Sequence, residues 1–585
     1  MRKSRHRTAI TISIAVMLLL VNAGTTMGRS KMTVVHATTF GAVAGDGKDD
    51  TTAVLAALEQ CRKASPATLV FPKGSYDFFA GSNPKDGNTL FPINSLNHLT
   101  IDGNGSEFTI HGITGVFWFG NCSDLTIKSL TIDWDQAPFS MGRVLAVEGN
   151  RFDVEVFPEY PIKGGEPVGA FMDYDPVTKL PMRHGLDEYN TVDKTELLRE
   201  QVLRVHLKHE ARIKPGVMVL LRHKVYGPGT FVCSRCSDVT VKDVTVHTVP
   251  GMGFIGSICN NITLEQFKVM PKPGSGRPMS ATADATHFGG CKGTIRMSGC
   301  EFEGMGDDGF NIKSGLYLSL KQKIDDHTVL AAHNLKMIDS PDPGDVMEVS
   351  HVDDLLPYAT VTVKKVEILP NDGLQRVEFE QPLPRTLKDG DVFGNATRTP
   401  RVRISNCQVR NNRARGMLIQ TRDVVVEGCK FINCTGPGIM VLTEVVHFFE
   451  SIGTRDVTIR KCTFENCNYG AAMGPAALCA MAWLKDFAYP AKPGVHKNVR
   501  LEGNIINGSA NSGIFAAGID GIAIKGNRLE NTCTDAAGNT GAAIFVMSSR
   551  GVLIDGNSID PAKQGAGFKK SVGFGEGVEK QPHIR

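Results

Sequence analysis

Three aspartates, Asp284, Asp307 and Asp308, have the residue type and the spacing that acid–base chemistry requires. Asp284 and Asp307 are 23 residues apart, and the same interval separates Cys236 from Cys259 in a repeated sequence pattern. We therefore expect the two aspartates on neighbouring coils of a repeat, with backbones roughly 4.8 Å apart. Two carboxylates at that distance cannot both ionise cheaply, so at least one pKa should be raised.

Asp308 follows Asp307 directly, and this adjacency needs a structural explanation. Side chains of neighbouring residues in a regular strand point to opposite faces, which would drive one carboxylate into the apolar interior. Gly306 and Gly309 flank the pair. Glycines there allow a bulge or a tight bend that presents both carboxylates outward. The alternatives are corner aspartates that cap turns, or a calcium site.

Convergent carboxylates are suited to the hydrolysis of a glycosidic bond. One protonated acid donates to the leaving oxygen, and an opposed carboxylate activates water. An inverting enzyme holds these two groups roughly 6.5–9.5 Å apart, which leaves room for the water. Three aspartates on two coils could meet this requirement, so we predict a catalytic trio that needs neither metal nor cofactor. Polar residues beside the trio are candidates for substrate binding: His287, Asn311 and Lys313.

Internal repeats indicate the fold that positions these residues. Residues 122–133 resemble residues 236–247, and residues 421–431 resemble residues 454–464. Each unit has a short strand with alternating Val, Ile or Leu, then a Gly, Asn or Cys corner, then a second short strand. One unit cannot bury its apolar face alone, but stacked units bury it against their neighbours. The pattern predicts an all-β protein built on a right-handed parallel β-helix, whereas a propeller blade would need four strands in about 40 residues.

Two segments interrupt the repeat, and both contain longer alternating strands with hairpin turns, which predict small antiparallel β-barrels or sandwiches. An amphipathic helix near residue 55 is expected to cover the open N-terminal end of the solenoid. The predicted organisation is β-helix with capping helix over 37–137, insertion over 138–230, central β-helix with the aspartates over 231–317, insertion over 318–397, β-helix over 398–561, and a disordered tail over 562–585.

The N-terminus has the layout of a secretory signal peptide, which we place at residues 1–24. A basic start that contains Arg2 and Arg7 precedes an uncharged apolar run from Ala9 to Val21, which is short for a membrane span. We expect a secreted or periplasmic protein with no membrane association after signal removal. Loss of the segment's four basic residues would take the formal net charge from +3 to about −1, which does not suit a nucleic-acid partner.

The chain contains 14 cysteines, a number that in an exported protein first suggests disulfides. However, Cys300, Cys407, Cys429 and Cys462 share one position of the repeat, each followed two residues later by an apolar residue. Cysteine at such a position behaves as a small hydrophobic side chain. We therefore expect these thiols to pack in the solenoid without bridges.

Several of these motifs together resemble glycoside hydrolase family 110, a family of inverting exo-acting α-1,3-galactosidases. The resemblance covers most of residues 37–560, including the two insertions. It rests on Asp284-x-x-His287, the Asp307–Asp308 pair, Asn411 to Gly416, Ile101 to Phe108 with His111-Gly112, and Thr131 to Asp135 with Pro138-Phe139.

This resemblance implies roles for individual residues and a glycan with terminal α-galactose as the substrate. It implies that Asp307 donates the proton and that Asp284 and Asp308 activate the water. Further residues that it implies in the sugar pocket are Arg413, Arg415 and Glu450. Lys313 is a departure, because the family usually has histidine there, and lysine brings a fixed positive charge without an imidazole acceptor. The identity of the sugar is therefore open at this point.

Two other functions fit the same sequence. A polysaccharide lyase would use calcium-bound carboxylates and a basic residue such as Lys313 or Arg415 to abstract a proton. A non-catalytic glycan-binding surface protein could be built on the same solenoid.

Overall fold

The computed structural model describes residues 32–83, 88–333, 340–370, 373–470, 473–536, 540–579 and the backbone of 583–584. The signal peptide predicted at residues 1–24 lies outside the described residues. Within the described ranges, no helix has both the length and the apolar character needed to cross a bilayer.

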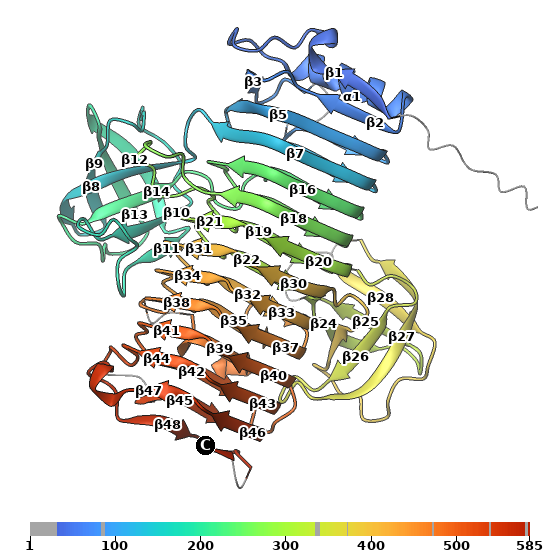
Figure 1. Ribbon diagram of the computed structural model, residues 1–585, viewed down its shortest axis with the longest axis vertical. Helices are drawn as coiled ribbons and strands as arrows, with labels where there is room; N and C mark the ends of the chain where they lie inside the picture. Colours follow the sequence, from blue (N-terminus) through green and yellow to red (C-terminus); the bar gives the residue numbers. More distant parts are fainter. Residues whose placement is uncertain are drawn as a thin grey trace, which may run out of the picture.

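Short parallel strands stack coil upon coil along the length of the molecule (Figure 1). Their alternating Val, Ile and Leu side chains point inward, as at Val239, Val241, Val244 and Val246, which are all buried. The larger sheet has 22 strands among the described residues. They are β1 (Thr33–His36), β2 (Ala67–Val70), β3 (Ser75–Phe79), β5 (Asn97–His111), β7 (Ser123–Trp134), β16 (Ser237–Val246), β18 (Asn260–Val269), β20 (Lys292–Ser298), β21 (Glu301–Glu303), β30 (Arg401–Ser405), β31 (Gln408–Arg410), β33 (Arg422–Glu427), β34 (Lys430–Ile432), β37 (Arg455–Arg460), β38 (Thr463–Glu465), β40 (His496–Glu502), β41 (Ile505–Asn507), β43 (Ile519–Lys525), β44 (Arg528–Glu530), β46 (Arg550–Asp555), β47 (Ser558–Ile559) and β49 (His583–Ile584).

A second parallel sheet closes each coil on another face, and it has 12 strands among the described residues. They are β4 (Thr89–Asn94), β6 (Gly115–Gly120), β15 (Phe231–Ser234), β17 (Phe254–Ser257), β19 (Thr286–Gly289), β22 (Phe310–Lys313), β32 (Met417–Gln420), β35 (Ile439–Glu444), β39 (Ala476–Trp483), β42 (Ser512–Ala517), β45 (Ala542–Met547) and β48 (Lys570–Phe574). One continuous apolar core runs between the two sheets. The predicted parallel β-helix is confirmed.

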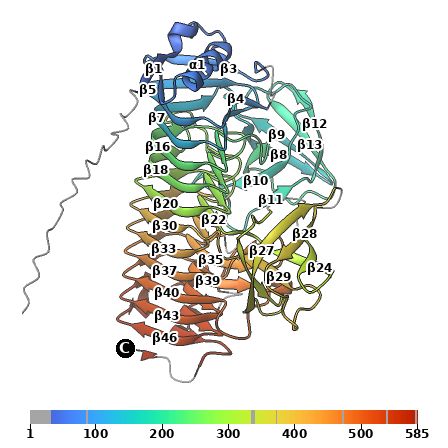
Figure 2. The same ribbon diagram turned by 90° about the vertical axis from the view of Figure 1, so that its right-hand side faces the viewer.

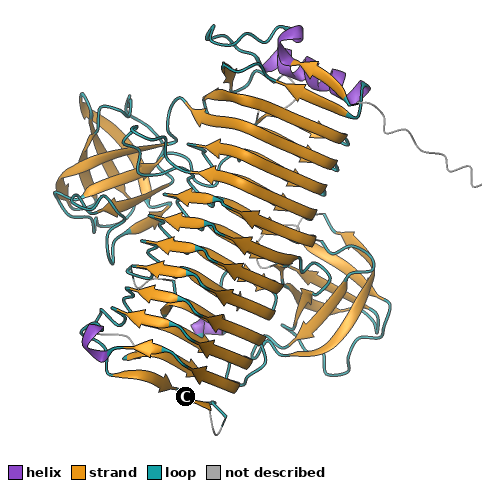
Figure 3. Ribbon diagram, viewed as in Figure 1, coloured by secondary structure: helices purple, strands orange, loops and turns teal. Residues whose placement is uncertain are grey.

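The N-terminal end of the solenoid is covered by α1 (Thr51–Lys63), beside the short η1 (Ala37–Phe40) (Figure 3). Val54, Ala57, Leu58 and Cys61 form the buried face of α1 and belong to the solenoid core. The helix therefore shields apolar side chains that an open end would expose to water.

Both insertions are antiparallel, and they lie beside the solenoid (Figure 2). The first forms an antiparallel sheet in the order β11-β10-β14-β8-β9-β13-β12, and the second forms a closed barrel in the order β24-β25-β28-β27-β26-β29. The strands of the first are β8 (Phe139–Glu148), β9 (Arg151–Val156), β10 (Ala170–Tyr174), β11 (Asp187–Tyr189), β12 (Val192–Arg199), β13 (Val202–Leu207) and β14 (Met218–Arg222). Those of the second are β24 (Leu318–Lys323), β25 (Thr328–Ala332), β26 (Val346–Ser350), β27 (Pro357–Ile368), β28 (Leu374–Phe379) and β29 (Val392–Asn395).

The prediction of a disordered tail over residues 562–585 is wrong for the residues that the structure describes. η3 (Pro561–Lys563) leads to β48, which pairs in parallel with β45, and β49 pairs with β46. This segment is rich in glycine, which favours disorder, but Gly573 is closely packed: a Cβ added there would lie 2.9 Å from the Ala542 side chain. A glycine can thus serve close packing between coils as well as chain flexibility.

All 14 cysteines lie in described residues, and all are free and buried. Cys300, Cys407, Cys429 and Cys462 belong to the apolar core of the solenoid, which is the packing role expected from their place in the repeat.

Candidate active site

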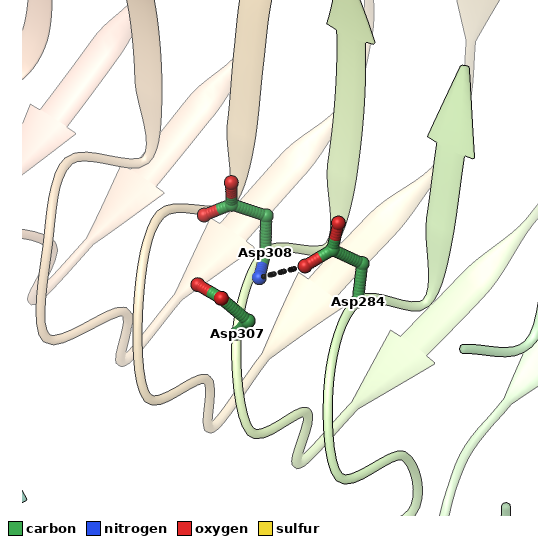
Figure 4. A group of neighbouring side chains, drawn as sticks. All are labelled: Asp284, Asp307 and Asp308. Atoms are coloured by element: carbon green, nitrogen blue, oxygen red, sulfur yellow. Dashed lines mark hydrogen bonds between the residues drawn. The ribbon is translucent and has the colours of Figure 1, made fainter. Parts of the chain in front are cut away.

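Asp284 and Asp308 face each other across neighbouring coils of the second sheet. β19 and β22 pair in parallel with Thr286 opposite Phe310, so the residue that lies opposite Asp284 is Asp308. The 23-residue spacing had suggested Asp307. The register instead corresponds to 24 residues, and the Asp308 backbone N–H donates to Asp284 Oδ1 at 3.1 Å (Figure 4).

Arg415 continues this row on the next coil. β22 pairs with β32, with Phe310 opposite Met417, which places Arg415 beside Asp308. Its Nε donates to Asp308 Oδ1 and its Nη2 to Oδ2, both at 2.8 Å, and its backbone N–H also donates to Oδ1 at 3.2 Å. Such a two-pronged contact fixes both the position and the orientation of the carboxylate.

Asp307 and Asp308 lie in the corner between β21 and β22, outside any strand, so strand alternation does not force one of them inward. The two flanking glycines bring this corner into close contact with the adjoining coils. A Cβ on Gly306 would lie 2.5 Å from the carbonyl oxygen of Thr282, and one on Gly309 would lie 2.6 Å from that of Gly416. Both glycines are therefore required by packing.

The three aspartates converge on one small volume (Figure 4). One carboxylate oxygen of each lies within 4.8 Å of the others, which is closer than the roughly 6.5–9.5 Å expected between the acid and the base of an inverting enzyme. The assignment of an inverting mechanism therefore rests on the family resemblance and not on this spacing. Oxygen ligands in this arrangement could hold a hard cation. Arg415, however, already supplies Asp308 with a positive charge and two hydrogen bonds.

The first insertion reaches over to Asp307. The Tyr226 hydroxyl, just after β14, donates to Asp307 Oδ2, and Arg413 Nη1 lies 3.4 Å from Asp307 Oδ1. Arg413 also forms an ion pair with Asp187 of β11. The buried Arg222 donates to Asp187 Oδ1 at 2.8 Å. The insertion thus fixes both groups that contact Asp307.

A cavity of about 570 Å³, here called the catalytic cavity, opens at Asp307. Asp307 has 16% of its side chain exposed, whereas Asp284 and Asp308 are 3% and 1% exposed as residues. Asp307 is therefore the aspartate that a ligand reaches first. The walls of the catalytic cavity are Tyr189, Tyr226, Asp307, Arg413, Arg415, Leu442, Glu444, His447, Phe448, Glu450, Met473, Trp483 and Phe487.

Lys313 and Glu450 form a buried ion pair beside this cavity. Glu450 lies in β36 (Glu450–Ser451), which pairs with β23 (Gly315–Leu316). Lys313 Nζ donates to Glu450 Oε1 at 2.7 Å, and Gln420 Nε2 donates to Oε2 at 3.0 Å. Glu450 lines the cavity, whereas Lys313 contacts Glu450 and is not among the described residues that line the cavity.

His287 and Asn311 contact two of the aspartates and are not among the described residues that line the cavity. His287 Nδ1 is 2.7 Å from Asp284 Oδ2, and Asn311 Nδ2 donates to Asp308 Oδ2 at 3.5 Å. Of the residues predicted to bind substrate, the structure thus brings Arg413, Arg415 and Glu450 to the cavity wall.

Burial dominates the ionisation of this cluster. It raises the pKa of Asp284 well above its usual range, with a further increase from Asp308. It raises the pKa of Asp307 to about 6, helped by Asp284, and that of Asp308 to about 6 despite Arg415. Burial and Lys313 together lower the pKa of His287 to about 3. The imidazole is therefore neutral at physiological pH.

At Glu450 the neighbouring lysine outweighs burial. Although burial raises the pKa of this carboxyl, Lys313 beside it brings the value down to about 2. Glu450 is therefore ionised at every pH at which the protein is expected to work. Burial and the neighbouring Arg415 lower the pKa of Arg413 to about 9.

Several wall residues were not predicted from the sequence. Tyr189 and Tyr226 belong to the first insertion, which carries no repeat signal. Trp483 is the last residue of β39 and Phe487 follows that strand, whose register the sequence does not reveal. His447, Trp483 and Phe487 form edge-on aromatic contacts at the cavity mouth.

Comparisons with known proteins agree with this architecture. Residues 389–481 match a family model described as a right-handed β-helix region, which confirms the predicted handedness, and residues 336–393 match one described as GLAA-B β-barrel domain II. Alpha-1,3-galactosidase A of Shewanella woodyi is 28% identical over 71% of this chain and 73% of its own. Alpha-1,3-galactosidase B of Bacteroides thetaiotaomicron is 26% identical over 86% and 87%.

A structural neighbour, the family 28 exopolygalacturonase of Yersinia enterocolitica, has a TM-score of 0.45 and 11% identity over 94% of this chain and 79% of that one. The resemblance inferred from the motifs is confirmed by the sequence relatives: over most of its length, the chain is related to proteins named alpha-1,3-galactosidase A and B.

Proposed function

We propose that the chain is an exo-acting glycoside hydrolase that removes terminal α-linked galactose from glycans by an inverting acid–base mechanism. The observation that carries the proposal is Asp307, a carboxyl group at the wall of a cavity, with a pKa raised to about 6 and two ionisable neighbours. The printed names of the related proteins support galactose as the sugar and α-1,3 as the linkage.

Asp307 is the proton donor in this mechanism. A carboxyl with a pKa near 6 is still partly protonated close to neutrality, which suits an acid that must both hold and release a proton. The Tyr226 hydroxyl donates to Oδ2 and Arg413 approaches Oδ1, so the carboxyl orientation is fixed before substrate arrives.

Asp284 and Asp308 activate the water. Arg415 donates to Asp308, and His287 Nδ1 lies 2.7 Å from Asp284 Oδ2, so these contacts align the two side chains. Since these groups are strongly coupled, the proton that leaves the water is shared by the pair rather than belonging to one residue. Arg413, Arg415 and Glu450 supply donors and an acceptor for the sugar hydroxyls at the cavity wall.

The proposal is tested by the release of galactose from a panel of α- and β-linked galactosides. Asp307→Asn should lower kcat/KM by about 10²- to 10⁴-fold, as loss of a general acid does. Asp389→Asn is the matched control, because Asp389 is exposed, belongs to the second insertion and is not among the described residues that line the catalytic cavity. Wild-type activity in Asp307→Asn would contradict the assignment, as would an unsaturated product that absorbs in the near ultraviolet, which a lyase would form.

Export from the cytoplasm is a separate proposal, which rests on the basic residues before the apolar run from Ala9 to Val21. Fractionation of expressing cells and N-terminal sequencing of the product test it. A cytoplasmic product that retains residues 1–24 would contradict it.

A further inference from the structure

A second cavity, of about 590 Å³, lies in the first insertion and is here called the insertion cavity. Its walls come from three stretches of that insertion, residues 165–169, 189–195 and 223–226. Ligand sites in proteins have volumes of about 300–1,000 Å³, so this cavity is large enough for a bound molecule. The catalytic mechanism makes no use of it.

The insertion cavity and the catalytic cavity meet at two tyrosines. Tyr189 and Tyr226 line both of them. Tyr226 is 54% exposed, and its hydroxyl donates to Asp307. The two cavities therefore share this tyrosine pair, one member of which is hydrogen-bonded to Asp307 in the wall of the catalytic cavity.

The place of the proton donor determines where the leaving group must lie. A general acid protonates the oxygen that joins the terminal sugar to the rest of the glycan, so that oxygen lies next to Asp307. With the terminal sugar in the catalytic cavity, the remaining sugars extend from Asp307 past Tyr226. We propose that the insertion cavity binds the leaving-group portion of an oligosaccharide, an inference that rests on the proposed glycosidase function.

The side chains of the insertion cavity suit sugar hydroxyls. Asp193, Lys194 and Lys224 line it and are exposed, and none of the three side chains has a hydrogen-bond or ion-pair partner among the residues that the structure describes. Together they offer both an acceptor and donors. Val168 and the ring of Tyr226 supply apolar surface for the faces of sugar rings.

The experiment compares substrates of increasing length. The double variant Asp193→Ala/Lys194→Ala and the blocking variant Lys194→Trp are assayed with p-nitrophenyl α-galactoside and with α-galactosyl-terminated di- and tetrasaccharides. We expect kcat/KM for the tetrasaccharide to fall about tenfold, as the loss of one or two hydrogen bonds would cause. The values for the aryl galactoside should remain those of the wild type, which also shows that the variants fold.

A matched control is Met182→Ala, in a third cavity of about 450 Å³ that shares Arg413 and Met473 with the catalytic cavity. Loss of tetrasaccharide activity in this control, and none in the Lys194 variants, would overturn the inference. So would equal losses for long and short substrates in Lys194→Trp.

Direct binding separates this inference from the proposed function. NMR titration of the tetrasaccharide's leaving group, the oligosaccharide without its galactose, should shift wild-type resonances and leave those of Lys194→Trp unchanged. If the oligosaccharide binds while no galactoside is hydrolysed, the proposed function fails and the insertion cavity remains a glycan site. If galactosides are hydrolysed and the oligosaccharide does not bind, the inference fails alone.

Discussion

Asp308 stands directly opposite Asp284 on the neighbouring coil, and its backbone N–H donates to Asp284 Oδ1 at 3.1 Å. Arg415 repeats this relationship one coil further, where its backbone N–H donates to Asp308 Oδ1 at 3.2 Å. The repeat of the solenoid thus places charged residues of three successive coils in one row. Asp307, one residue before this row, is the member that reaches the cavity.

Tyr226→Phe tests the hydrogen bond to Asp307. This bond lowers the pKa of Asp307, which burial otherwise raises, so its removal should raise that pKa further. In the proposed mechanism Asp307 must be protonated to act, so activity is lost as pH rises through its pKa. The alkaline limb of the kcat/KM profile should therefore move up by about one pH unit. An unmoved limb would show that Tyr226 does not act through Asp307.

Arg415→Lys tests the two-pronged contact with Asp308. Lysine keeps the charge but cannot donate to both carboxylate oxygens in a fixed plane. We expect the pKa of Asp308 to rise and the acidic limb of the pH profile to move upward, with a loss of roughly 100-fold in kcat/KM, the size of one general-base contribution. A pH profile identical to that of the wild type would exclude this role.

Lys313 and Glu450 are best tested as a pair. Lys313→Met leaves the buried Glu450 carboxylate without its cation, which should cost about 3–5 kcal/mol in the free energy of unfolding. Adding Glu450→Gln removes the uncompensated charge and should restore most of that stability. Urea denaturation of both single variants and the double variant measures the coupling. Additive effects would show that the pair is not energetically linked.

The raised pKa of Asp307 also predicts a trade between function and stability. In the unfolded chain an aspartate titrates near 3.9, whereas in the folded protein Asp307 titrates near 6. Below about pH 4 the carboxyl is protonated in both states, so its ionisation costs no stability. As pH rises from about 4 to 6 the carboxyl ionises in the unfolded state first, so the folded protein loses stability over this range. Asp307→Asn, which does not titrate, should exceed the wild type by up to about 3 kcal/mol at pH 7.5.

Urea denaturation of Asp307→Asn and wild type at pH 4.5 and pH 7.5 checks this, with Asp389→Asn as the control. The advantage of Asp307→Asn should shrink at the lower pH. A difference that does not change with pH would mean that Asp307 is not strained by burial.

The repeat made the fold predictable, and with it the proximity of the three aspartates. Cys236 and Cys259 revealed the length of a coil, and that length placed Asp284 and Asp307 on adjacent coils. The predicted register is wrong by one residue. The coil from β19 to β22 spans 24 positions and not 23, so Asp308 lies opposite Asp284. Local insertions at corners change the register, and sequence periodicity averages over them.

Contacts made by the first insertion could not be predicted. Tyr226 and Asp187 carry no motif, and they matter only because the insertion folds back onto the solenoid corner at Asp307 and Arg413. The support of Asp284 by His287 was also hidden, since a histidine three residues from an aspartate fits substrate binding equally well. The order of the tail could not be predicted because its glycine content favours flexibility, whereas the close packing at Gly573 becomes visible only in the structure.

We propose that Asp307, together with Asp284 and Asp308, hydrolyses the glycosidic bond with inversion. The most direct measurement is proton NMR of the galactose released in the first minutes from an α-1,3-linked galactoside. Immediate appearance of β-galactose, followed by slow mutarotation, is the predicted result. Immediate appearance of the α anomer, or of no galactose at all, would contradict this mechanism.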